Sequence, residues 1–353
     1  MVDDQRNNLM TKIEIAGRII GEEHPPFVIM EAGINHEGQF DKAIQLVDAA
    51  IENGADCIKF QCHITEEEMI PTDMKPGGIS EERLWDIIKR CELSADEEKK
   101  VQAYCGQRGI LYLSTPFSRA AADRLASMGV PAFKIGSGEC NNYPLIDHIA
   151  RMGRPIILST GMNDIPSIAR SVEIMRGNGC PFMLMHCTSM YPTPYDKVRL
   201  QAMVELKETF GVPIGLSDHS KGIYTCLGAV ALGASVLEKH FTVSHDWPGP
   251  DIPVSIDPAE LKELVAGSRA IWQARGGTKT VLFEEQPVID FAYATVVTIG
   301  AVRAGEVFTR DNLWVKRPGT GRILAKDYES VLGKKAVRDL HANVHVNPED
   351  IAV

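Results

Sequence analysis

The feature that most restricts the fold is a regular alternation of short apolar runs and amphipathic segments. Eight runs rich in apolar residues have the length and composition of buried strands, at residues 28–34, 57–62, 110–115, 132–138, 155–161, 182–188, 213–219 and 236–242. Between them, apolar residues recur at helical spacing, most clearly at 40–55, 118–129 and 167–179. Eight strands that alternate with helices predict a parallel (β/α)8 TIM barrel, because a doubly wound sheet rarely offers so many.

The sequence also predicts where the domains begin and end. We expect a barrel domain over residues 1–280, with a hairpin at 12–21 and an extended loop at 63–95. A linker at 281–292, within a stretch 277–292 that could be extended, then leads to a small domain at 293–353. Residues 301–315 align with 339–353 at an offset of 38, so that Ala304 matches Ala342 and Phe308 matches Val346. This internal similarity predicts a small, pseudo-symmetric β-rich domain.

Composition excludes several classes of protein. A net charge of −10 disfavours nucleic acid as the main partner, because phosphate binding requires a basic surface. No apolar run approaches the length of a membrane span, and the first residues lack the apolar core of a signal peptide. The eight cysteines form no CxxC pair, which favours buried free thiols in a reducing cytoplasm.

Every expected strand becomes polar where it ends. In a barrel of this kind the active site lies at the carboxyl ends of the strands, so these side chains should surround a single mouth. They are Glu31, Lys59 with Gln61, Thr115, Lys134 with Ser137, Ser159, His186, Asp218 with His219, and Glu238 with His240.

This ring of side chains predicts metal-assisted chemistry on an anion. His219 and His240 end consecutive strands and could form an open divalent metal site, although two histidines hydrogen-bonded to carboxylates would also explain them. Asp218 and Glu238 are either supporting or structural acids. Buried lysines at 59 and 134 require a carboxylate, a phosphate or a carbonyl as partner. Four hydroxyl residues could complete an anion cradle: Thr115, Ser137, Ser159 and Ser217.

Several motifs resemble those of bacterial N-acetylneuraminate (sialic acid) synthases. The matching stretches are EAGINHEG (31–38), IKFQ (58–61), FKIGSGECNNYPLI (133–146), HCTSMYPTP (186–194), GLSDHS (215–220), EKHFT (238–242) and GPDI (249–252). NLWVKRPGTG (312–321) resembles the antifreeze-like (SAF) domain of that family. The resemblance runs from about residue 12 to the end of the chain.

The resemblance implies condensation of phosphoenolpyruvate with N-acetylmannosamine, giving sialic acid and phosphate with C–O cleavage. It implies that His219 and His240 hold a divalent metal, Mn²⁺ before Mg²⁺ or Co²⁺. The carboxylate and phosphate would contact Lys59, Thr115, Lys134, Ser137, Ser159 and Ser217. The sugar would contact Glu31, Gln61, Tyr191 and Asp251, with Glu31 as the acid and base. Ser189 stands where some of these synthases carry Asn, which puts one substrate contact in doubt.

The resemblance further implies a homodimer with exchanged C-terminal domains, in which Arg317 reaches the sugar from the partner chain. Three alternatives remain open. The first is a sister synthase that makes legionaminic or pseudaminic acid from a 6-deoxy-diacetamido sugar. The second is a Schiff-base aldolase using Lys134 or Lys239, and the third is a non-catalytic carbohydrate-binding protein.

Overall fold

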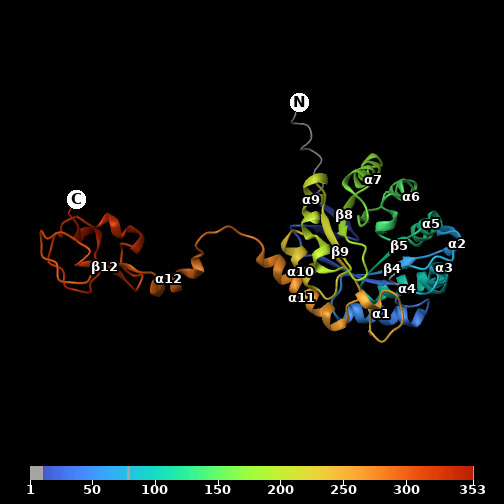
Figure 1. Ribbon diagram of the computed structural model, residues 1–353, viewed down its shortest axis with the longest axis horizontal. Coiled ribbons are helices and arrows are strands. Elements are labelled where there is room, and N and C mark those ends of the chain that lie inside the picture. The colour runs from blue at the N-terminus through green and yellow to red at the C-terminus, as the bar shows by residue number, and fades with distance from the viewer. Residues whose placement is uncertain (1–10, 78–79, 353) are drawn as a thin grey trace, which may run out of the picture. The chain divides into compact units, whose positions relative to one another are not determined.

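The computed structural model describes residues 11–77 and 80–352 (Figure 1). The chain divides into two compact units, with the boundary between Gly276 and Gly277. Within the described residues, no helix is both long and apolar enough to cross a membrane.

The first unit is the expected barrel of eight parallel strands. They are β3 (Phe27–Gly33), β4 (Cys57–Cys62), β5 (Leu111–Pro116), β6 (Phe133–Ile135), β7 (Ile156–Ser159), β8 (Phe182–Cys187), β9 (Ile214–Asp218) and β10 (Val236–His240). The hydrogen-bonded order is β5-β4-β3-β10-β9-β8-β7-β6, and β5 also lies beside β6, which completes the ring. The expected hairpin is present as β1 (Lys12–Ile15) paired antiparallel with β2 (Arg18–Gly21).

Helices surround the strands, as Figure 1 shows. They are α1 (Phe40–Glu52), α4 (Ala95–Arg108), α5 (Arg119–Met128), α6 (Tyr143–Ala150), α7 (Ile165–Gly177), α8 (Tyr195–Val198), α9 (Leu200–Phe210), α10 (Tyr224–Ala231) and α11 (Pro258–Ala274). Their apolar faces pack on the outer side of the barrel and form the main core. The interval 63–95 is more ordered than an extended loop, because it contains α2 (Thr65–Glu68) and α3 (Leu84–Cys91).

The second unit is small and rich in short β pairings. Strands β11 (Thr295–Thr298) and β12 (Leu313–Lys316) pair antiparallel above a compact apolar core. The internal similarity appears in its hydrogen bonds: Thr309 N–H donates to Asn312, and Asn347 N–H donates to Asp350 at the same offset of 38. The two copies also meet at an antiparallel bridge between Val302 and Leu340. The small β domain is therefore built from two related halves.

The expectation of an extended linker is wrong for its second half. A short 3-10 turn at Phe283–Glu285 leads into α12 (Gln286–Ala292). Pro287 lies in the first turn of this helix, where its fixed φ suits a helix start and its missing N–H costs nothing. The helix shortens the reach of the segment compared with an extended chain.

Candidate active site

The register of β9 and β10 explains why these strands end in charged residues. Ser217 lies opposite Glu238 and Asp218 opposite Lys239, so side chains alternate between the barrel interior and the helices outside. Ser217 Oγ donates to Glu238 Oε1 at 2.9 Å on the inner side. On the outer side, Lys239 Nζ donates to Asp218 Oδ2 at 2.7 Å, and Thr225 of α10 donates to the same oxygen at 2.8 Å. Two ionic clusters therefore lie back to back.

The outer cluster excludes one earlier alternative. Lys239 is fully buried, paired with Asp218 and also donates to the Ser220 carbonyl. It lies away from the barrel interior and has no access to a substrate carbonyl. A Schiff base on Lys239 is therefore wrong.

Inside the barrel, two lysines and two glutamates form one buried cluster. Lys59 forms an ion pair with Glu31, and its Nζ lies 3.9 Å from Glu238 Oε2. Lys134 Nζ lies 3.4 Å from Glu238 Oε1, so Glu238 stands between the two cations. Burial raises the pKa of Glu31 and lowers the pKa of Lys134. Burial acts to raise the pKa of Glu238 as well, but the two lysines hold it below its usual value.

Hydroxyl groups complete the inner surface beside the lysines. Lys59 Nζ donates to Thr115 Oγ1 at 3.0 Å, and Lys134 Nζ donates to Ser159 Oγ at 2.7 Å. With Ser217, three of the predicted anion-binding hydroxyls therefore lie against this cluster.

Gly161 brings two further predicted residues together. Its backbone N–H donates to Ser137 Oγ at 3.0 Å. A Cβ added to Gly161 would lie 2.8 Å from Ser137 Oγ, 2.5 Å from Ser189 Oγ and 3.1 Å from Cys187 Sγ. Only a residue without a side chain fits between these groups, so the glycine allows the two hydroxyls to converge.

His219 and His240 are neighbours at the mouth, with ring centroids 5.3 Å apart. His219 Nδ1 lies 3.1 Å from the Thr188 carbonyl oxygen, to which it donates, so Nε2 is the nitrogen left for a ligand. His240 Nδ1 is buried without a hydrogen-bond partner, 3.6 Å from Asp251 Oδ2. Burial lowers the pKa of His240 well below its ordinary value, which keeps it neutral, as metal ligation requires. These donors fit a divalent ion.

The residues assigned to the sugar also converge. A Cβ at Gly33 would lie 3.2 Å from Asp251, 3.4 Å from Glu31 and 3.6 Å from Gln61. Burial raises the pKa of Asp251 to about 6. The Tyr191 ring lies 4.2 Å from the His219 ring, centroid to centroid. Arg317 belongs to the second unit, so its approach to the barrel stays a prediction.

From the sequence we expect no functional role for His63, Glu68 or Cys187, because a metal site that joins His63 to Cys62 or Cys187 to His186 would need neighbouring residues to point the same way. Glu238 is more than the supporting or structural acid that we expect from the sequence, because its position two residues before His240 places it on the same inner face. Cys187 Sγ lies 3.7 Å from His219 Nδ1. His63 follows β4 and contacts Gln61, and Glu68 follows it on α2. The ends of β4 and β8 place His63 and Cys187 near the mouth, but their contacts with Glu68 and His219 are tertiary, so no local pattern predicts them.

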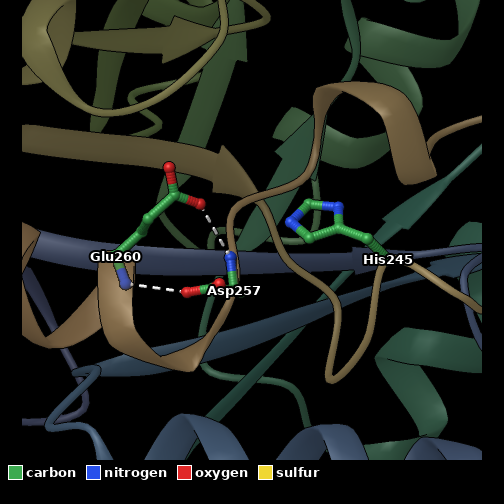
Figure 2. Close-up of side chains that lie close together, drawn as sticks. All are labelled: His245, Asp257 and Glu260. Carbon is green, nitrogen blue, oxygen red and sulfur yellow. Dashed lines mark hydrogen bonds between the residues drawn. The ribbon is translucent and has the colours of Figure 1, made fainter.

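A second group of metal-binding residue types lies nearby, formed by His245, Asp257 and Glu260 (Figure 2). Asp257 and Glu260 already form a capping box: each carboxylate accepts the other residue's backbone N–H at the start of α11. The N-terminus of a helix also carries partial positive charge, which disfavours a cation. Helix capping accounts for these two acids.

Comparison with known proteins supplies the family. The NeuB family matches residues 46–280, and the SAF domain matches residues 293–352. The chain belongs to the NeuB family. It is an enzyme of the nonulosonic acid synthase group, which condenses phosphoenolpyruvate with a sugar and depends on a metal. The resemblance drawn from the motifs is confirmed at this level.

Several members of the family are similar over most of their length. An N,N'-diacetyllegionaminic acid synthase of Campylobacter jejuni is 38% identical over 88% of this chain and 96% of the relative. The human N-acetylneuraminate-9-phosphate synthase is 34% identical over 91% of each chain. The crystal structure of a sialic acid synthetase from Leptospira borgpetersenii superposes with a TM-score of 0.73 at 34% identity, covering 79% of this chain and 95% of that one.

Proposed function

We propose that this enzyme condenses phosphoenolpyruvate with N-acetylmannosamine to give N-acetylneuraminate and phosphate. The observation that carries the phosphoenolpyruvate half is the pair of buried lysines, each hydrogen-bonded to a hydroxyl and both flanking Glu238. Lys59 and Lys134 would neutralise the carboxylate and phosphate. Thr115, Ser137, Ser159, Ser189 and Ser217 would hold their oxygens by hydrogen bonds.

The sugar would lie between this cradle and the histidine pair, with Gln61, Tyr191 and Asp251 on its hydroxyls. C3 of phosphoenolpyruvate forms a bond to the aldehyde carbon, and the aldehyde oxygen takes a proton. Water then bonds to C2 and gives its proton to Glu31. The C2–O bond to phosphate breaks, its electron pair leaves with the phosphate, and the remaining C2 hydroxyl proton passes to that phosphate, which leaves a 2-keto acid. A divalent ion held by His219 and His240 would supply Lewis-acid polarisation of the aldehyde oxygen.

A second acceptor has specific support. The 38% identical relative from Campylobacter jejuni is an N,N'-diacetyllegionaminic acid synthase, so a 6-deoxy-diacetamido sugar is the alternative acceptor. Both acceptors present the same aldehyde and neighbouring acetamido group. They differ at the carbons farther from the reaction.

The deciding experiment is phosphate release from phosphoenolpyruvate with a panel of acetamido sugars. N-acetylmannosamine, its 6-phosphate and a 6-deoxy-diacetamido sugar should be compared by kcat/KM, since this ratio measures discrimination between substrates. The highest value with N-acetylmannosamine supports the proposal. A higher value with the diacetamido sugar assigns the alternative, and no release with any acceptor refutes both.

We further propose that Arg317 acts across a homodimer with exchanged small domains, within the domain limits 1–280 and 293–353 inferred from the sequence. Arginine suits recognition of an acetamido carbonyl, because it stays charged and donates in a planar fork. Co-expression of His219→Ala with Arg317→Ala tests the exchange. Mixed dimers should regain one complete site, whereas action within one chain would leave every site defective.

A further inference from the structure

A hydrogen-bonded chain leads from Glu31 away from the mouth. Gln61 Nε2 donates to Glu31 Oε1 at 2.9 Å. His63 Nε2 lies 3.0 Å from Gln61 Oε1, and His63 Nδ1 lies 3.0 Å from both carboxylate oxygens of Glu68. The side chains of His63 and Glu68 are 3% and 5% exposed, so water provides few hydrogen bonds to either group. The chain joins β3, β4 and the short helix α2.

The positions of the hydrogens follow from the donors and acceptors. Gln61 uses its amide N–H toward Glu31, so its oxygen faces His63 and requires an N–H at Nε2. Both oxygens of Glu68 surround Nδ1, which therefore also carries a hydrogen. Each ring nitrogen of His63 therefore faces an acceptor, Gln61 on one side and Glu68 on the other. The ring of Phe117 stacks on that of His63 at 4.6 Å with planes 12° apart, which fixes the plane of the His63 ring.

We propose that His63 and Glu68 are positioning residues for the condensation: the charged pair fixes the Gln61 amide, and Gln61 in turn fixes the Glu31 carboxylate. If the amide rotated, its oxygen would face Glu31 and the two acceptors would repel each other. With the amide fixed, Oε1 of Glu31 is held by Gln61 and Oε2 faces Lys59. Oε2 is then the oxygen that exchanges a proton. This inference rests on the proposed role of Glu31.

Other titratable groups also surround His63. Besides Glu68, the groups whose charges act on it are Glu98, Asp251 and His36. Two of these are carboxylic acids. Burial and the charge of His63 lower the pKa of His36 to about 4, so His36 is neutral and adds no competing charge.

Two variants test the positioning role. His63→Phe keeps a flat ring against Phe117 but removes both donors, and Glu68→Gln keeps the shape but removes the charge. We expect kcat to fall about 10–100-fold in both, with KM for phosphoenolpyruvate changed less than about twofold. In a Gln61→Leu background, His63→Phe should cause no further loss. His148→Phe is the matched control, because the exposed pair of His148 and Asp123 lies 2.7 Å apart on the outside of the barrel.

A measurement independent of activity separates this inference from the proposed function. In ¹⁵N-histidine-labelled protein near neutral pH, the His63 ring, identified by its loss in His63→Phe, should show two protonated nitrogens. In Glu68→Gln it should show one. A neutral ring in the unchanged protein would overturn the inference. So would a further fall in kcat when His63→Phe is added to Gln61→Leu. Absence of phosphate release by the unchanged enzyme would refute the proposed function instead, and the ring spectrum would still decide the charge of His63.

Discussion

Lys239→Met should strongly destabilise the barrel while leaving the inner cluster untouched. Asp218 and Lys239 are 2% and 0% exposed, so the variant would leave a buried carboxylate without its cation. Removing one partner of a buried ion pair costs about 3–5 kcal/mol of unfolding free energy. Asp218 keeps donors from Ser220 and Thr225, which favours the lower part of this range.

The pKa of Asp218 determines how this loss of stability should change with pH. Burial acts to raise the pKa of Asp218, but the ion pair with Lys239 and nearby donors hold it below 3.8. The pair therefore stabilises the folded chain above that value, and its contribution is lost as pH falls through the folded-state pKa. Without Lys239, burial dominates and the pKa of Asp218 rises. Protonation of Asp218 then removes the unpaired buried charge from the variant. The difference in unfolding free energy from the unchanged protein should therefore shrink as pH falls from neutral toward 4.

Urea denaturation followed by circular dichroism measures this difference in the full chain. Asp218→Asn combined with Lys239→Met should be more stable than Lys239→Met alone, because no unpaired charge remains. Arg151→Met is the control, since it breaks an exposed ion pair with Asp147 and should change little. If Lys239→Met loses as little unfolding free energy as the control, or if its loss does not change with pH, the prediction is refuted.

Four further predictions concern the chemistry. A chelator should abolish phosphate release and Mn²⁺ should restore it, whereas full turnover of metal-stripped enzyme would contradict a role for His219 and His240. In ¹⁸O-water the released phosphate should carry no label, because water attacks C2; labelled phosphate would show P–O cleavage. Gly161→Ala should lower kcat/KM for phosphoenolpyruvate about 10-fold or more, because its Cβ would lie within 3.0 Å of two hydroxyls; an unchanged value would place the phosphate elsewhere. Binding of phosphoenolpyruvate to metal-free protein should take up protons at Glu31, whose pKa burial already raises. The uptake appears as a calorimetric enthalpy that varies with the ionisation enthalpy of the buffer, and no variation would contradict protonation of Glu31 on binding.

The barrel could be predicted from the sequence because the same pattern, an apolar strand followed by an amphipathic helix, recurs along the chain. Strand β4 was expected at 57–62 and lies there, since its apolar run ends at a clear polar boundary. Strand β6 is shorter than the expected 132–138, because Ser137–Glu139 turn into a 3-10 helix. Local turn geometry overrides the apolar pattern there, and it places Ser137 within reach of Gly161.

The candidate site could be predicted only where a residue's position along its own strand determines whether its side chain points into or out of the barrel. Lys59, Lys134 and His240 follow from alternation along single strands. Lys239 was misjudged because its partner Asp218 belongs to the neighbouring strand, and only the register brings the two together. Glu68 lies on a helix in a segment expected to be an extended loop. No periodic pattern in the sequence therefore indicates its contact with His63.

In the proposed reaction, the inner cluster would let the same residues serve both halves. Lys59 and Lys134 are balanced by Glu31 and Glu238, so the four charges cancel before substrate arrives. A carboxylate and a phosphate bound to the lysines leave two glutamates with excess negative charge. Glu31 is the one whose pKa is already raised, so its Oε2 is where a proton would enter as Lys59 turns to the substrate. That proton would then be available for the aldehyde oxygen during C–C bond formation, which would return Glu31 to the carboxylate that the attacking water requires.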